Sequence, residues 1–270
     1  AGRALQAAGS AEVMLSAQAW PLLGPSARGV KDASGCMKLH TLSGAAAPEA
    51  TNVSFLSMPP LGADLLLPIR RAVPRPVLEY WGAELERWLS EFRRVSVIFV
   101  RLPALEDLDL PRVSLLERAV ATAHDVMRQY GGTVYQLLMD EKGLALVLGF
   151  GLPGQSHEDD AERALRAALD LRALLARLDL TPNVGVASGT VFCSLLSTQV
   201  RRAYTLLGAP MNQAARLMQR AQAEVLCDET SASAVGEGRG LLFEHASQAA
   251  DGDGALRPQL TPGHIHLSRA

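Results

Sequence analysis

The sequence predicts an α+β fold whose elements follow the order β-α-β-β-α-β, that of a ferredoxin-like domain. Residues 95–100 are apolar except for Ser96, as in a central strand buried on both faces. A helical repeat of apolar residues then runs from about Pro111 to the helix-ending pair Gly131-Gly132. Residues 133–139 and 144–150 are two strand-like runs joined by a short polar turn, which predicts a hairpin.

The later part of the chain supplies the remaining elements. We expect, in order, a helix that starts at residues 156–159, strands at 184–187 and 190–196, a short strand ending at Gly208, a helix from Met211, an edge strand at 224–227, a short helix from Thr230 and one strand around 241–244. The helix that starts at residues 156–159 and the strand that follows it complete the ferredoxin-like unit.

Composition describes a globular protein. Of the 270 residues, 48% are hydrophobic and 20% are charged, and the net charge is -2. This balance argues against nucleic acid or an anionic membrane as the main partner. We expect no membrane span and a cytoplasmic location. Three scattered cysteines lack the spacing of metal ligands, which predicts reduced thiols, buried and inert at Cys193 and Cys227.

Composition and sequence pattern divide the chain into four segments. Residues 1–64 are rich in Ala, Gly, Ser and Pro and predict a low-complexity linker or connector. Residues 65–94 lead into the main domain, which we place at 95–235, and residues 236–270 form a C-terminal extension that ends in loops. Because the chain begins at Ala, we read it as a fragment of a longer protein.

The residues around the strand that ends at Gly208 carry the strongest functional signal. Asn212 and Arg216 stand four apart in the following helix, so both side chains lie on one helical face next to the strand that holds Thr205. An amide and a guanidinium there could meet a ribose and a phosphate together. A purely structural interpretation is an Asn near a helix start and a solvated Arg one turn later.

Four ordered motifs resemble the class III nucleotidyl cyclases, in particular the soluble, bicarbonate-responsive adenylyl cyclase type. The four lie at 140–143, 150–154, 157–161 and 185–193, and the segment at 204–217 that follows them resembles the family pattern YTVIG…VNLAARL. The resemblance covers roughly residues 65–234. It implies a βαββαβ cyclase catalytic domain in which two similar halves, possessing complementary residues, share each ATP site.

Mapped onto this chain, the resemblance is to the second, metal-free half. It implies that Asn212 positions the ribose and that Arg216 stabilises the α-phosphate in the transition state. It further implies that Thr205 and the backbone of Leu206 bind adenine, with Gln136 in the place of an adenine-binding Lys. The partners implied are ATP, a second cyclase half and bicarbonate.

The metal site departs from the family. A metal-bearing half has Asp at the end of its opening strand, where this chain has Arg101, a cation that cannot ligate Mg²⁺. Asp140 falls near the place of the second metal aspartate, but a lone carboxylate there is more simply a turn residue. We therefore expect no metal ligands in this chain, with Mg²⁺ or Mn²⁺ held by the partner half.

Three other departures leave a second interpretation open. Gln136 lacks the charge of the family Lys, and Ser194 and Ser197 replace family glycines, which would strain the backbone if those positions need a positive φ. The alternative to an active half is thus a degenerate cyclase-like regulatory or dimerisation module without turnover. A guanylyl cyclase fits less well, because neither Thr205 nor Gln136 offers a carboxylate to guanine.

Overall fold

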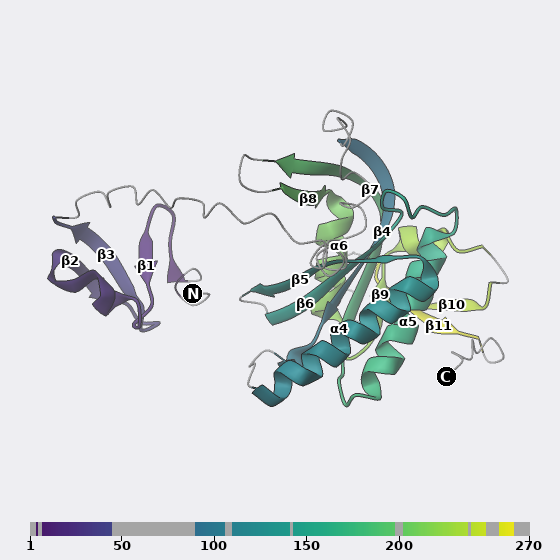
Figure 1. Ribbon diagram of the computed structural model, residues 1–270, viewed down its shortest axis with the longest axis horizontal. Helices are drawn as coiled ribbons and strands as arrows, with labels where there is room; N and C mark the ends of the chain where they lie inside the picture. Colours follow the sequence, from purple (N-terminus) through teal and green to yellow (C-terminus); the bar gives the residue numbers. More distant parts are fainter. Residues whose placement is uncertain are drawn as a thin grey trace, which may run out of the picture. The chain divides into compact units, whose positions relative to one another are not determined.

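The computed structural model describes residues 4, 7–44, 90–105, 110–140, 143–197, 202–236, 239–246 and 254–261. These residues fall into two units, a small N-terminal one and a larger one that begins before β4, and each is described by itself (Figure 1).

The larger unit is built on one mixed sheet with the strand order β10-β11-β9-β7-β4-β6-β5, and β8 pairs with β7 outside this path. The strands are β4 (Glu91–Arg101), β5 (Thr133–Asp140), β6 (Gly143–Phe150), β7 (Asn183–Ser197), β8 (Arg202–Leu207), β9 (Val225–Cys227), β10 (Leu241–His245) and β11 (Leu256–Leu260). The helices are η3 (Pro103–Leu105), α4 (Leu110–Tyr130), α5 (Asp160–Ala176), α6 (Ala209–Arg220) and α7 (Glu229–Ser233).

The predicted ferredoxin-like core is confirmed. Its elements follow in the order β4-α4-β5-β6-α5-β7, and its strands lie in the order β7-β4-β6-β5. The apolar strand β4 is central, with β6 and β7 antiparallel on its two sides. A run that is apolar apart from Ser96 suits this place, because helices cover both faces of the strand.

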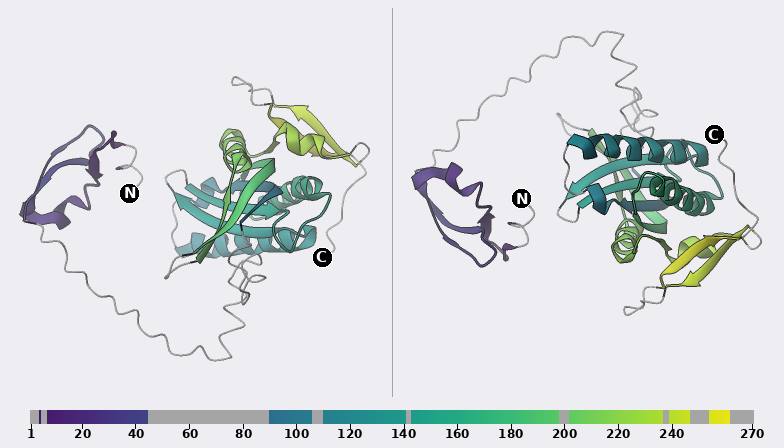
Figure 2. Two further views of the ribbon diagram at one scale, coloured as in Figure 1. Left: turned by 90° about the horizontal axis from the view of Figure 1, so that it is seen from above. Right: turned by 90° about the horizontal axis from the view of Figure 1, so that it is seen from below.

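Helices pack against both faces of the sheet. Helices α4 and α5 pack against one face, where Ile98 and Val100 of β4 lie. Helix α6 packs against the other face with Val97 and Phe99, the alternate residues of the same strand. Figure 2 shows α6 and α4 on opposite sides of the sheet. The sheet is therefore buried on both sides along residues 95–100 of β4.

Strand β7 corrects the prediction of two strands at 184–187 and 190–196. It is continuous through Gly189, and its residues Asn183–Cys193 pair with the whole length of β4. Glycine usually weakens a strand. Here Gly189 stays in the ladder because the ring of Pro210 fills the space beside it, where a Cβ would lie 2.9 Å from Pro210 Cγ.

The C-terminal region also differs from prediction. Strand β9 is not an edge strand: it lies between β7 and β11, and all three of its residues are buried. The extension from residue 236 holds β10 and also β11, where loops were predicted. The sequence did not predict β11 because it contains Pro258, and Pro normally argues against an interior strand. Pro258 pairs with Phe243 of β10.

The N-terminal unit is a three-stranded antiparallel sheet with the order β1-β3-β2. Its elements are β1 (Val13–Leu15), η1 (Trp20–Ser26), β2 (Ala27–Lys31) and β3 (Met37–Leu42). The prediction of a linker over 1–64 is therefore wrong for residues 13–42. The Asp32 carboxylate stabilises the β2–β3 turn by accepting hydrogen bonds from the backbone N–H groups of Ser34 (3.0 Å) and Cys36 (2.9 Å).

Of the predicted lead-in segment 65–94, residues 65–89 lie outside the described residues.

The three cysteines are free and buried, as predicted for Cys193 and Cys227. Burial raises the pKa of both of these thiols, so they stay protonated and unreactive. Within the described ranges, none of the helices combines the length and the apolar character that a membrane crossing requires.

The contact between α6 and β7 yields the first prediction. A Cβ at Gly185 would lie 2.1 Å from the Ala214 carbonyl oxygen and 2.3 Å from the Met218 nitrogen, both backbone atoms. Gly185→Ala should therefore lower the free energy of unfolding by about 3 kcal/mol, measured with denaturant. Gly236→Ala is the matched control, since its nearest neighbour would be Arg239 Cγ at 3.8 Å. Equal stability of the two variants would contradict this packing.

Candidate functional site

Helix α6 turns one face to the sheet and the other to solvent. Its buried residues are Pro210, Ala214, Leu217 and Met218. Asn212 and Arg216 lie on the opposite face and are exposed. The structure therefore brings these two predicted site residues together on one surface, four residues apart, as their spacing indicated.

The orientation of α6 is fixed by how closely it approaches β7. Gly185 leaves the helix backbone in direct contact with the strand, and Pro210, in the first turn, packs beside Gly189. Pro suits this turn because its missing N–H needs no partner there. Rotation of α6 about its axis would drive side chains into β7. The packing of the buried face of α6 therefore determines that Arg216 points away from the sheet.

Strand β8 carries the predicted adenine-binding residues directly before α6. Thr205 is half-buried and pairs with Ser194 of β7, while Leu206 is buried opposite Cys193. Among the described strands β8 pairs with β7 alone, so no further strand takes up the backbone groups of its second edge.

A hydrogen bond connects β8 to the strand that carries Gln136. The Tyr135 hydroxyl donates to the Tyr204 carbonyl oxygen at 2.8 Å. Burial raises the pKa of Tyr135, so this hydroxyl stays protonated and remains a donor. Gln136 is exposed on β5, one residue away. Sequence reasoning missed Tyr135, because nothing in its local pattern shows that β5 and β8 meet.

The site is an open surface rather than an enclosed pocket. In the described part of the chain, the side chains of Gln136, Thr205, Asn212 and Arg216 make no hydrogen bond or ion pair. A cavity of about 420 Å³ does lie near the start of α6, but none of these four residues lines it. Its lining residues are Ser188, Gly189, Thr190, Ala209, Pro210, Gln213, Asp228, Glu229, Thr230 and Gly254.

Chemically, the surface can bind an anion and polar oxygens. A guanidinium forms paired hydrogen bonds to phosphate oxygens, and an amide both donates to and accepts from hydroxyl groups. An exposed Arg216 and Asn212 one helical turn apart can therefore engage a phosphate and a neighbouring sugar. Full use of such exposed groups requires a second surface that excludes water.

The metal positions hold no matching donor set. Arg101 ends β4, and by strand alternation it shares the face of Val97 and Phe99. Asp140 ends β5, and its side chain lies outside the described part. Among the described residues, no three His, Cys, Asp or Glu side chains gather in a way that could hold a metal ion.

The serines that replace family glycines do not strain the chain. Ser194 lies in regular antiparallel pairing with Thr205, and Ser197 pairs with Arg202. In the described residues, positive φ outside glycine occurs at Ala11, Asp179 and Ala223. The condition for strain is thus not met. Ser194 instead places its hydroxyl 2.9 Å from that of Ser90.

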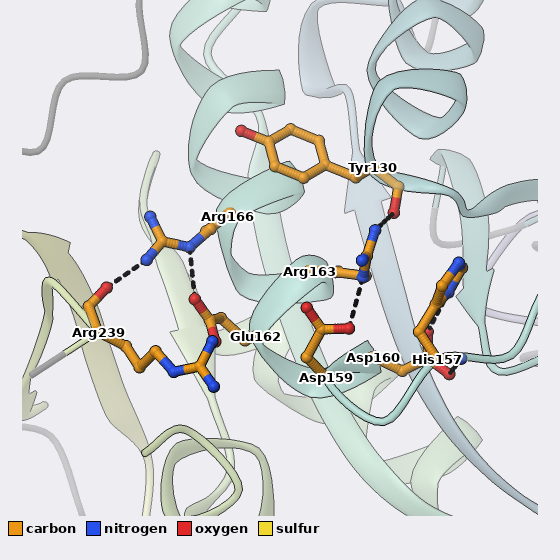
Figure 3. Close-up of polar contacts among 8 residues, drawn as sticks. All are labelled: Tyr130, His157, Asp159, Asp160, Glu162, Arg163, Arg166 and Arg239. Atoms are coloured by element: carbon orange, nitrogen blue, oxygen red, sulfur yellow. Dashed lines mark hydrogen bonds and ion pairs between the residues drawn. The ribbon is translucent and has the colours of Figure 1, made fainter. Parts of the chain in front are cut away.

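The motif at 157–161 has a structural role at the start of α5 (Figure 3). The Asp160 carboxylate accepts the backbone N–H of His157 at 2.9 Å, which satisfies a donor ahead of the helix. The buried Glu162 carboxylate is held by Arg166 at 2.9 Å and by Arg239 at 3.2 Å. These partners account for the carboxylates without a ligand.

The same helix start is joined to the end of α4. Arg163 donates to the Asp159 carboxylate at 2.6 Å and to the Tyr130 carbonyl oxygen at 3.1 Å (Figure 3). The hydrogen bond from Arg163 lowers the pKa of Asp159, so that carboxylate stays ionised. The motif therefore fixes α4 and α5 on the sheet face opposite α6.

Comparison with known sequences finds relatives among the cyclases, although no family model matches the chain. The chain is 31% identical over 173 residues to adenylate cyclase type 10 of Oryctolagus cuniculus, covering 62% of this chain and 11% of that protein. The Homo sapiens protein of the same name is 32% identical over 154 residues, or 55% of this chain and 9% of the relative. The chain thus spans a small part of these relatives.

Solved structures share the fold. The adenylyl cyclase CyaB from P. aeruginosa superposes with a TM-score of 0.57 and 17% identity, covering 65% of this chain and 98% of that one. The guanylate cyclase domain of RhGC from Catenaria anguillulae, in complex with GTP, gives a TM-score of 0.53 and 15% identity, covering 62% and 96%. Since one is an adenylyl and the other a guanylate cyclase, the likeness concerns the fold and not the nucleotide.

The link between β5 and β8 generates the second prediction. Tyr135→Phe removes the hydroxyl that holds the Tyr204 carbonyl and should lower the free energy of unfolding by about 1 kcal/mol. Amide hydrogen exchange in residues 204–206 should accelerate. Tyr130→Phe is the control, because its hydroxyl donates to Asp170 on the other side of the sheet. If the control accelerates exchange in 204–206 equally, the hydrogen bond has no special role at this strand.

Proposed function

The larger unit of this chain is a class III nucleotidyl cyclase catalytic domain, and we propose that it is the metal-free half of an adenylyl cyclase. In this proposal it converts ATP to cyclic AMP and pyrophosphate at a site shared with a metal-bearing half. The observation that carries the proposal is the exposed pair Asn212 and Arg216 on the outward face of α6.

The reaction explains why this pair is needed. The ribose 3′ oxygen attacks the α-phosphorus, the bond to the pyrophosphate oxygen breaks, and the 3′ hydroxyl proton is lost. Negative charge grows around the α-phosphate in transit, and a fixed guanidinium such as Arg216 stabilises it. Asn212 orients the ribose so that the 3′ oxygen lies in line with the leaving group. Neither residue has a competing partner in the described part of the chain.

Adenine binding falls to β8 and β5 in this proposal. Thr205 and the backbone of Leu206 lie at the end of β8 that leads into α6, and Gln136 lies on the strand that Tyr135 fastens to β8. A hydroxyl, a peptide group and an amide can together pair with the hydrogen-bonding edge of a purine.

Metal binding is assigned to the other half. The residues at the metal positions here do not fit Mg²⁺ or Mn²⁺, since Arg101 offers only donors. A second cyclase half, in the same longer chain or as a separate subunit, would hold the ions. Bicarbonate as a further ligand and a cytoplasmic location belong to this proposal through the resemblance to the soluble adenylyl cyclases.

A second candidate function is a regulatory or dimerisation module without turnover. Arg101 at the end of β4 and the uncharged Gln136 favour it. Ser194 does not, because its strand geometry is regular.

Cyclic AMP production decides between the two. The chain is assayed with ATP and Mg²⁺ or Mn²⁺, alone and mixed with a metal-bearing first half of the soluble type. Activity in the mixture alone supports the proposal. If the mixture produces no cyclic AMP although ultracentrifugation shows that the halves associate, the result supports the regulatory module instead.

Arg216 gives the third prediction. Arg216→Ala should lower turnover in the mixture by about 10²–10³-fold, because the lost contact acts on the transition state. Binding of ATP and the unfolding transition should change little, since the side chain is exposed. Gln219→Ala, also exposed on α6, should keep full turnover. Equal turnover of both variants would contradict the role of Arg216.

Gln136 gives the fourth prediction. Gln136→Lys should tighten ATP binding by the mixture about tenfold, because a charged donor bonds more strongly than an amide. Calorimetric titration with a non-hydrolysable ATP analogue measures this. Gln136→Met, of similar length and without donors, should weaken binding. If neither substitution changes the affinity for the ATP analogue, Gln136 does not contact adenine.

A further inference from the structure

The small N-terminal unit repeats the end of the larger unit. Its strands lie in the order β1-β3-β2, and the last strands of the larger unit lie in the order β9-β11-β10. In both, a short first strand is followed by a helical segment and then by two strands, and the third strand lies in the middle. Neighbouring strands are antiparallel in both.

The register of the two sheets is also the same. In the N-terminal unit Met37 lies between Leu15 and Lys31. In the larger unit Leu256 lies between Cys227 and His245. Each of these residues occupies the same position within its strand, because Leu15 and Cys227 end their strands and Met37 and Leu256 begin theirs.

The entry into the first strand repeats an unusual backbone conformation. Ala11 has φ 62° and Ala223 has φ 55°, values that L-residues other than Asn and Asp seldom adopt. Each begins the same three residues, Ala-Glu-Val, two positions ahead of β1 and β9. A shared strained alanine is stronger evidence than a shared strand order, since a plain antiparallel meander does not require it.

Side-chain contacts correspond as well. Glu12, beside Ala11, forms an ion pair with Lys38 of β3. Glu224, beside Ala223, forms one with Arg257 of β11 at 2.5 Å. Both carboxylates belong to the residue just before the first strand, and both cations follow the first residue of the middle strand.

Two further pairs of corresponding hydrogen bonds complete the match. The Ser16 hydroxyl accepts the Ala19 N–H at 3.2 Å, and the Asp228 carboxylate accepts the Ser231 N–H at 2.9 Å, each directly after the first strand. At the far end of the hairpin, the Asp32 N–H donates to the Cys36 carbonyl at 2.9 Å. Its counterpart runs from Ala246 to Ala255 at 3.0 Å.

The two copies differ in what covers the first strand. Strand β9 pairs with β7 in parallel on its second edge, with Val184 opposite Val225 and Val186 opposite Cys227. Val225 is 3% exposed. Its counterpart Val13 is 57% exposed, and among the described residues of its own unit β1 pairs with β3 alone. The N-terminal copy thus shows an apolar strand edge that is occupied in the other copy.

We infer that residues 11–42 are the terminal sheet module of another class III cyclase half, and that the open edge of β1 takes a parallel strand of that half as β9 takes β7. The occupant follows from the copy in which the same edge is filled. The inference rests on the shared fold and not on catalysis. It would make the N-terminal unit part of a partner half rather than a connector.

A module exchange within the full chain tests this. Residues 223–260 are replaced by residues 11–42, which places Val13, Met14 and Leu15 where Val225, Leu226 and Cys227 lie. The chimera should unfold in one cooperative transition, and amide exchange of residues 184–186 should stay within about tenfold of the parent chain. A second chimera with Met14→Leu and Leu15→Cys reproduces the β9 sequence, so that a packing mismatch alone cannot mimic failure.

Two matched valine substitutions complete the test. In the chimera, Val13→Asp should accelerate exchange of residues 184–186 by about 100-fold or more, because it buries a charge at the place of Val225. Val30→Asp should not, although Val30 is 58% exposed like Val13, because its counterpart is the exposed Glu244. In the unmodified chain both substitutions should leave residues 184–186 unchanged.

Loss of protection at residues 184–186 in both chimeras, or tolerance of Val13→Asp in a protected chimera, would overturn the inference. Neither readout involves cyclic AMP, so the result is independent of whether the domain is catalytically active.

Discussion

The close approach of α6 to β7 is the constraint on which the candidate site depends. Gly185 has no side chain to separate the two elements, so the helix backbone lies against the strand. That contact determines which residues of α6 are buried, and Asn212 and Arg216 are exposed as a consequence. The chemistry proposed for the outer face of the helix is thus fixed by a glycine that no substrate would touch.

The remaining polar contacts divide between holding the scaffold and leaving groups available. On the α4 and α5 side, carboxylates such as Glu162 are paired with arginines and are accounted for by the fold. On the α6 side, Tyr135 uses its hydroxyl to join two strands, while Arg216 has no partner among the described residues. A guanidinium such as that of Arg216 is what a half-site requires, because its complement comes from a second surface.

Local pattern was sufficient for the core elements and for the spacing of Asn212 and Arg216, since both depend on the period of a single strand or helix. It failed where a residue owes its conformation to a distant neighbour. Gly189 continues a strand because Pro210 fills the space beside it, and Pro258 sits in a strand that its type argues against. The part played by Tyr135 likewise required knowing that β5 and β8 meet. The N-terminal sheet was hidden by its composition, although its Ala-Glu-Val repeat was visible in the sequence.

The exposed edge of β1 has a consequence for handling the protein. A strand edge with free backbone groups and apolar side chains pairs with other edges it meets, and Val13 and Leu22 both add exposed apolar surface in this unit. This edge should therefore contribute to self-association of the protein at high concentration. A shorter polypeptide that begins near residue 90 would lack this edge and would still contain β4 to β11.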